Sequence, residues 1–124
     1  MSYARRLIVA VTTAADGSAT AYSEPITSGT LSQIRYVKTD FADGSTFTIT
    51  SEATGETLWT EAAVNASATR APRQPTHTTA GVASLYAGAG TAVNDKIALA
   101  SDRIKVVIAS GGDTKIGAFH FLMG

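Results

Sequence analysis

The sequence contains two histidines, His77 and His120, and a catalytic site that moves protons near neutral pH would be expected to use one of them. A hydrolase pairs such a base with a serine nucleophile and a carboxylate, but no G-x-S-x-G segment is present. His120 lies in an alternating apolar segment, which favours a packed imidazole, and His77 lies among threonines in a loop. We therefore expect no enzymatic activity, and a small hydrolase using either histidine remains an alternative.

The acidic residues give no stronger indication of a metal or cofactor site. Asp40 and Asp43 are close in sequence, but they flank a turn, where Asp beside Gly is common. The segment GAGTAV at 88–93 lacks the third glycine of a dinucleotide-binding loop. The absence of cysteine excludes thiol chemistry and disulfides. We expect no catalytic, cofactor-binding or metal-binding residues, and no cofactor.

Three glutamates, Glu52, Glu56 and Glu61, are close enough in sequence to suggest paired carboxylates for glycoside cleavage. Such a site needs a cleft with aromatic walls, and Trp59 and Tyr36 are the only obvious candidates. Exposed polar strand faces explain the glutamates equally well. A carbohydrate-binding β-sandwich with Trp59 and Tyr36 as stacking platforms remains an alternative function from another class.

The overall charge argues against nucleic acid as a partner. Ten basic residues balance ten acidic ones, whereas a protein that binds phosphate backbones normally has a basic excess. No apolar run approaches the roughly eighteen residues that span a membrane. Arg5 and Arg6 precede the apolar segment 7–11, which is too short for a secretion signal. A net charge near zero gives little protection against association, which suits a protein that assembles.

Short runs of period-two alternation separated by turn residues recur along the chain. Leu7, Val9 and Val11 alternate with their neighbours and predict a first strand at about 4–13. Similar runs follow, with abundant Thr and Val and few helix signals. The sequence predicts an all-β chain, 1–124, forming a single antiparallel β-sandwich or jelly-roll-like barrel. We expect about seven to eight short strands and one long Pro/Arg-containing loop.

Two hairpins are predicted from turn residues. An Asp-Gly turn joins residues 31–41 to 46–52, and a Gly-Gly-Asp turn joins 102–110 to 114–124. The last segment is apolar on both of its faces. We therefore expect it to be covered on one side by the core and on the other by a neighbouring subunit, which makes Phe119 and Phe121 candidate interaction residues.

The periodic pattern disappears between about residues 64 and 94, where only a short helical turn around 80–86 is expected. Structureless loops longer than about fifteen residues are uncommon in compact domains unless they are functional or disordered. Two prolines stiffen this segment, and two arginines offer planar forks for carboxylates. We interpret it as an extended arm that contacts another protein, with an ordinary solvated loop as the alternative. The candidate interaction residues are Arg70, Pro72, Arg73, Pro75 and His77.

Three segments resemble small β-rich structural proteins of tailed bacteriophage virions, including head decoration or cement proteins: IRYVKTDFADGSTFTIT, NASATRAPRQPTH and AVNDKIALASDRIKVVIASGGDTKIGAFHFL. The similarity covers most of the chain from about residue 31 onward. It implies a non-enzymatic virion component, made in the host cytoplasm, that binds the major capsid protein or other virion proteins. A position at the head-to-tail joint or in the tail is the alternative. Small β domains often gain stability by oligomerising, so we also expect self-association.

Overall fold

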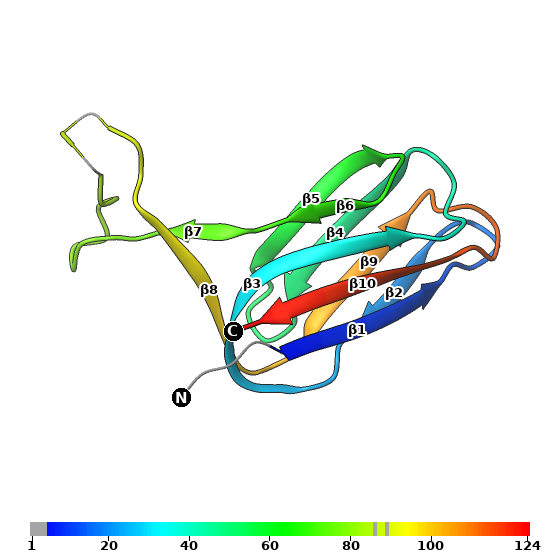
Figure 1. Cartoon of the computed structure of the whole chain (residues 1–124), viewed down its shortest axis with the longest axis horizontal. Helices are drawn as coiled ribbons and strands as arrows, with labels where there is room; N and C mark the ends of the chain where they lie inside the picture. The colour runs from blue at the N-terminus through cyan, green and yellow to red at the C-terminus, as the bar shows by residue number, and fades with distance from the viewer. Residues whose placement is uncertain (1–4, 86, 89) are drawn as a thin grey trace.

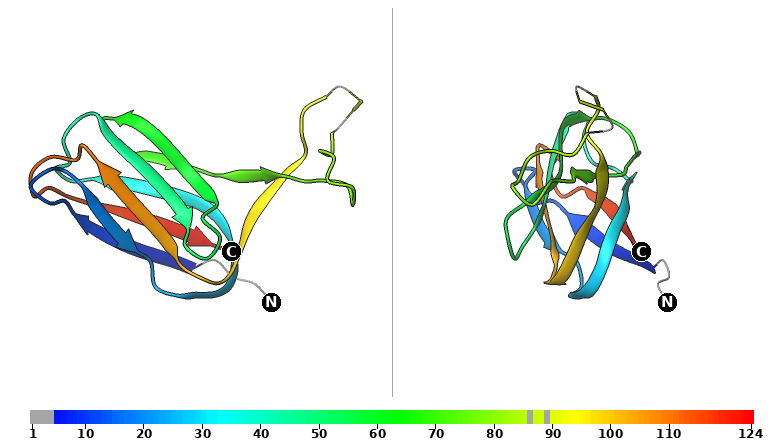
Figure 2. Two further views of the ribbon diagram at one scale, coloured as in Figure 1. Left: turned by 180° about the vertical axis from the view of Figure 1, so that it is seen from behind. Right: turned by 90° about the vertical axis from the view of Figure 1, so that its left-hand side faces the viewer.

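The computed structural model describes residues 5–85, 87–88 and 90–124. Two antiparallel sheets pack face to face, and an arm projects from one end of them (Figures 1 and 2). The prediction of an all-β sandwich is confirmed, with ten strands rather than seven or eight. The strands are β1 (Arg5–Thr12), β2 (Ala19–Tyr22), β3 (Ile26–Lys38), β4 (Ser45–Ser51), β5 (Thr57–Val64), β6 (Ala68–Arg70), β7 (Arg73–Pro75), β8 (Asn94–Asp102), β9 (Ile104–Ala109) and β10 (Ile116–Met123).

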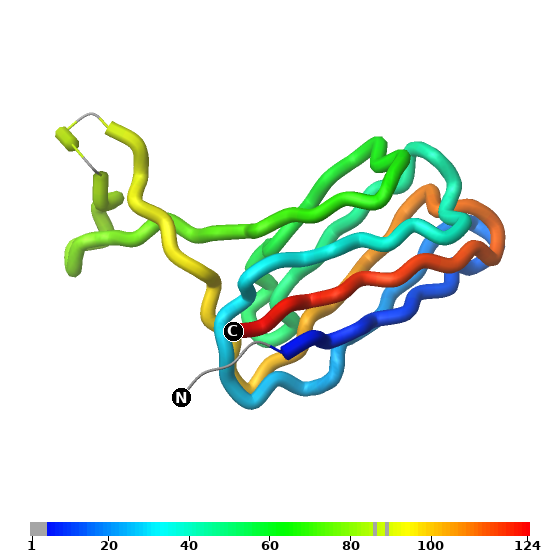
Figure 3. Tube along the Cα trace, viewed as in Figure 1, coloured from blue at the N-terminus to red at the C-terminus, as the bar shows by residue number. Residues whose placement is uncertain are grey.

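The strand order explains how the arm is attached. Sheet A has the order β1-β10-β3-β8-β7, with β6 also paired to β3, and sheet B has the order β2-β9-β4-β5. The long strand β8 belongs to both parts of the molecule. Its residues 97–102 pair with β3 inside the sandwich, whereas its residues 94–96 pair with β7 outside it. The tube in Figure 3 follows this path from the arm into the sandwich.

The core lies between the sheets and is centred on aromatic rings. Period-two alternation places Phe119 of sheet A and Phe47 of sheet B on the inner faces, with ring centroids 5.0 Å apart. Tyr36 lies 4.6 Å from Phe47 and 5.1 Å from Phe119. Edge-to-face and offset aromatic contacts at these distances add to the stabilisation from burial. The sandwich therefore has a complete core of its own, without the arm.

Both predicted hairpins are wrong, because the chain crosses between the sheets at each of these turns. β4 pairs with β5 and β9, not with β3, and β9 pairs with β2 and β4, not with β10. In the first turn the buried side chain of Phe41 enters the core and directs the chain from sheet A to sheet B. In the second turn the backbone amide of Gly111 donates to the carbonyl of Gly17, while the Gly111 carbonyl accepts from Ala42. A Cβ on Gly111 would lie 2.8 Å from Cγ2 of Thr13, so the turn requires glycine.

The helical turn expected around residues 80–86 is also not formed. The described residues of this segment, 80–85, take part in a tight turn and in strand-like bridges between His77 and Ala83 and between Leu85 and Ala92. Backbone hydrogen bonds to other parts of the arm replace the local ones of a helix. Residue 86 lies outside the described part. Nothing in the described part of the chain is a helix of the length and apolarity that crossing a membrane requires.

Candidate protein-interaction site

We use the term arm for residues 71–96, and tip for residues 76–93 within it. The arm projects from the end of the sandwich at which β8 enters sheet A beside β3 (Figures 1 and 3). Its stalk is the short ladder between β7 and β8, in which Arg73, Gln74 and Pro75 pair with residues 96, 95 and 94. The extended segment predicted for about 64–94 is therefore present, but it begins later, because β6 is still part of sheet A.

No described residue of the arm is buried. An isolated two-stranded ribbon is only marginally stable in water, because it has no apolar face to cover. Residues 74–93 also contain no Asp, Glu, Lys or Arg. Solvated loops are usually rich in charge, whereas the centres of protein interfaces are depleted of it. The arm therefore has the composition of a segment that becomes covered by another molecule.

The tip is ordered by backbone hydrogen bonds. The amide of Thr76 donates to the Val93 carbonyl at 2.8 Å, and the Val93 amide donates to the Ser84 carbonyl at 2.9 Å. The ladder thus continues into a third, returning segment. The returning segment exposes two apolar side chains, Val82 at 62% and Leu85 at 41%. The tip consequently presents apolar surface on a hydrogen-bonded backbone frame.

The base of the arm is clamped by an ion pair. Arg70 donates from Nε and Nη2 to the two carboxylate oxygens of Glu61, both at 2.8 Å. Trp59 Nε1 donates to the same carboxylate at 3.0 Å, and the Arg70 guanidinium lies 5.7 Å from the Trp59 ring centroid. The Arg70 guanidinium lowers the pKa of Glu61 below its ordinary value. This bidentate pair joins β6 to β5 immediately before the arm begins.

Arg73 fixes the first residues of the arm to the sandwich. Its Nη1 donates to the carbonyl oxygens of Ser32 and Pro72, both at 2.9 Å. Both arginines therefore already bond within the chain, and a partner carboxylate for them stays a prediction. Their position in the structure indicates that they orient the arm relative to the sandwich.

The structure brings together five of the predicted interaction residues and separates two from them. Phe119 and Phe121 are 0% exposed, because they lie on the inner face of β10. Their assignment to an interaction surface is corrected, since a buried ring cannot contact a partner. The outer face of β10 exposes Ile116, so its covering by a neighbouring subunit stays a prediction. The five residues in or beside the arm are Arg70, Pro72, Arg73, Pro75 and His77.

Three residues of this site were missed by the sequence interpretation. Val82 and Leu85 supply the exposed apolar surface of the tip, and Glu61 holds Arg70. The uncharged run 74–93 was the available signal for the first two. Nothing in the sequence indicated the pairing with Glu61, because that contact joins β6 of sheet A to β5 of sheet B.

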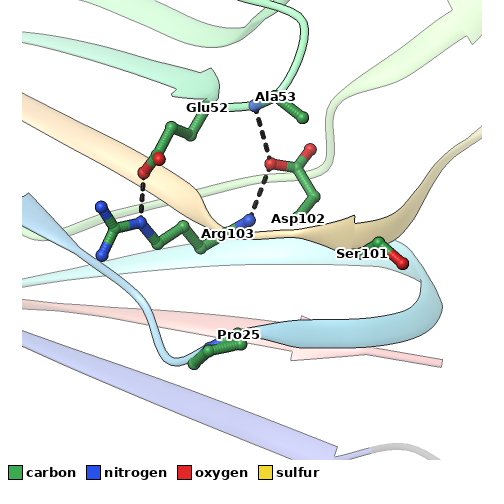
Figure 4. A pocket seen from close by; sticks show the side chains of 6 residues that line it. All are labelled: Pro25, Glu52, Ala53, Ser101, Asp102 and Arg103. Atoms are coloured by element: carbon green, nitrogen blue, oxygen red, sulfur yellow. Dashed lines mark hydrogen bonds and ion pairs between the residues drawn. The ribbon is translucent and has the colours of Figure 1, made fainter.

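A separate pocket lies at the corner between β8 and β9, and Figure 4 shows the side chains that line it. Its polar groups bond to one another. Glu52 forms an ion pair with Arg103, and Oδ1 of Asp102 accepts the backbone amides of Ala53 at 2.9 Å and Arg103 at 2.7 Å. Arg103 also stacks on Tyr22. These contacts indicate a structural corner in which the carboxylates already have partners.

The alternative functions find little support in the placement of their residues. Trp59 and Tyr36 are 7% and 0% exposed, so the stacking platforms of the carbohydrate-binding alternative are not at the surface. His77 lies in the arm, and Nδ1 of His120 lies 3.4 Å from Nη1 of Arg6 on the outer face of sheet A. Within residues 5–85, 87–88 and 90–124, no group of three or more side chains is arranged to hold a metal ion.

Comparisons with protein-family models, with curated proteins and with solved structures found no match to this chain. The functional argument therefore depends on the geometry of the arm and of the sandwich.

The clamp at the base of the arm predicts a pH dependence of stability. Because Arg70 lowers the pKa of Glu61, the pair stabilises the fold above the unfolded pKa of glutamate, near 4.5, and this contribution is lost as the pH falls through the lowered native value. Glu61→Gln should remove this dependence. The pair is partly exposed to solvent, which weakens it, so we expect the melting temperature at pH 7 to fall by only about 1–3 °C.

Thermal unfolding of wild type and Glu61→Gln from pH 7 to pH 3 measures this effect. The difference between the two proteins should shrink as the pH falls. The control is Glu56→Gln, since Glu56 is exposed and takes part in none of the described ion pairs. A constant difference between wild type and Glu61→Gln over the whole range would contradict the assignment.

Proposed function

We propose that this chain is a non-enzymatic structural protein of a tailed-bacteriophage virion, a capsid decoration or cement protein that binds the head lattice through its arm. The observation that carries the proposal is an arm in which no described residue is buried and whose tip contains no Asp, Glu, Lys or Arg, attached to a sandwich with its own core. The resemblance of the sequence to virion structural proteins supports the same function. The partner is the major capsid protein or another virion protein.

The division of the molecule into a sandwich and a projecting arm suits attachment to a large surface. The sandwich does not need the arm for its core, so the arm is available for a partner. Two prolines and the Arg70–Glu61 pair restrict the stalk, which lowers the entropy lost when it docks. Val82 and Leu85 supply exposed apolar side chains at the tip for contact with the partner.

Binding to undecorated heads tests the proposal. Purified protein mixed with heads that lack decoration should co-sediment with them, saturate at a fixed ratio to the capsid protein, and raise the temperature at which the heads release their contents. Parallel mixtures with isolated necks and tails distinguish the head lattice from the joint or tail position. If the protein co-sediments with none of the three, namely heads, necks and tails, the virion role is refuted.

A further inference from the structure

The strand orders of the two sheets end at β1, β7, β2 and β5, and the three-residue β6 also pairs on one side only. Among these strands, β1 lacks the usual protection against pairing. Native edge strands are commonly short, bulged, or interrupted by proline or charge. β2 has four residues, β7 has three and contains Pro75, and β5 is bulged twice and includes Ala63 at a φ of 56°. β1 differs from them. It has eight residues, pairs with β10 without a register shift, contains no Pro, and carries charge only at its first two residues, Arg5 and Arg6.

The side chains of β1 also leave apolar surface uncovered. On its outer face, Ile8 is 61% exposed and Ala10 is exposed. On its inner face, Val9 and Val11 are buried, but Leu7 is covered only in part. Within the described residues no strand pairs with the second edge of β1. An exposed, regular and apolar edge of this kind is a template for another strand.

We propose that two copies of this chain pair through β1, antiparallel about a two-fold axis, with Val9 opposite Val9 of the second copy. This register places Ile8 opposite Ala10 and Leu7 opposite Val11, so each side chain meets one from the same face of the sheet. Sheet A then continues from one copy into the other. The partly covered Leu7 becomes enclosed, and the two cores join along this seam.

The charges of β1 favour this register over one centred on Ile8. With Val9 at the axis, Arg6 lies opposite Thr12, and Arg5 lies beyond the paired segment. Centring the pairing on Ile8 would instead place Arg5 opposite the buried Val11 and desolvate its guanidinium. An axis between residues 8 and 9 would place inward-facing side chains of one copy opposite outward-facing side chains of the other. The chain carries no net charge, so long-range repulsion does not oppose association.

The pairing closes at two copies. A two-fold contact uses the same strand on both chains and leaves no second copy of that edge for a third chain. The other edges of the sandwich are short or bulged, as described above. The inference does not rest on the virion role, because the dimer is expected in the absence of any particle. If that role holds, a dimer carries two arms, and its binding to a lattice gains from bivalency.

Sedimentation equilibrium over rising protein concentration tests the dimer. The wild-type mass should rise from 12.8 kDa to twice that value. The variant Ile8→Lys/Ala10→Lys places a lysine of one copy directly opposite a lysine of the other. We expect it to raise the dissociation constant by about tenfold or more. Both positions are exposed, so the monomer should keep its fold. Circular dichroism and thermal unfolding check this.

A control and a rescue separate edge pairing from other contacts. Val37→Lys adds one lysine to the outer face of sheet A, two strands away from the edge, and should leave the dissociation constant unchanged. Ile8→Glu/Ala10→Glu should dissociate alone but form a heterodimer when mixed with the double-lysine variant. A monomeric wild type, an unaffected double-lysine variant, a comparable effect of Val37→Lys, or no heterodimer would each overturn the proposal.

Discussion

Removing the tip of the arm is expected to abolish binding to undecorated heads and to leave the sandwich folded. The change replaces residues 77–92 with Asn-Gly, so that a two-residue turn connects Thr76 to Val93. These two residues are already hydrogen-bonded across the ladder, and Asn-Gly is the preferred two-residue hairpin turn. No described residue among those removed is buried. We therefore expect the melting temperature to change by less than about 2 °C, and the affinity for heads to fall by at least about a hundredfold.

A variant with a full-length arm distinguishes the loss of apolar contacts from the shortening of the arm. Val82→Ser/Leu85→Ser keeps the backbone frame and removes the exposed apolar side chains, and we expect an affinity about tenfold lower. The matched control is Gln74→Ala, an exposed position in the stalk. Because the tip carries no charged side chain, wild-type binding should persist in high salt. Unchanged binding by the deletion variant would show that another surface docks, and a large loss of melting temperature would show that the arm stabilises the sandwich.

The strands were predictable because the alternation of inward-facing and outward-facing residues can be seen within a short stretch of sequence. In β10 the alternation of Phe119, Phe121 and Met123 with Ala118, His120 and Leu122 predicts which side chains face inward, and the structure has the first three buried. The step from this pattern to an interface was the error. Apolar residues on both faces indicate two covered faces, but they do not say which of the two is the core.

The pairing of strands could not be predicted from the turns. An Asp-Gly turn specifies a positive φ, observed at Gly44, and the same geometry serves a hairpin or a crossing between sheets. Here the choice depends on Phe41, whose ring packs in the core beside Tyr36. The contact between Arg70 and Glu61 likewise forms only because the chain returns from β5 to pair β6 with β3.

The arm shows what composition can add to periodicity. Pro and Arg drew attention to the base of this segment, where both arginines turned out to bond within the chain. The uncharged residues that follow were the better signal for a covered surface, because desolvating charge is costly whereas covering Val82 and Leu85 is favourable. Residues that stand out chemically therefore lie at the base of the arm, whereas the exposed apolar pair lies in the uncharged tip.

Truncating the ring at the centre of the core is expected to have the largest effect on stability. Phe119→Ala removes a ring that packs against Phe47 and Tyr36 and lies 6.3 Å from Trp59. Large-to-small changes at such sites cost about 3–5 kcal/mol, because both burial and packing are lost. That is a large part of the roughly 5–15 kcal/mol that stabilises a typical domain. The melting temperature should fall by about 10–20 °C in thermal unfolding followed by circular dichroism.

The control for this variant is the adjacent ring. Tyr36 is equally buried, its hydroxyl has no hydrogen-bond partner among the described residues, and burial raises the pKa of Tyr36 to about 12. Tyr36→Phe keeps the packing and removes an unsatisfied polar group, so stability should be unchanged or higher. The pair of variants distinguishes a core from an interface. If Phe119 acted in binding rather than in the core, Phe119→Ala would weaken association and melt like the wild type, and that result would contradict the packing described here.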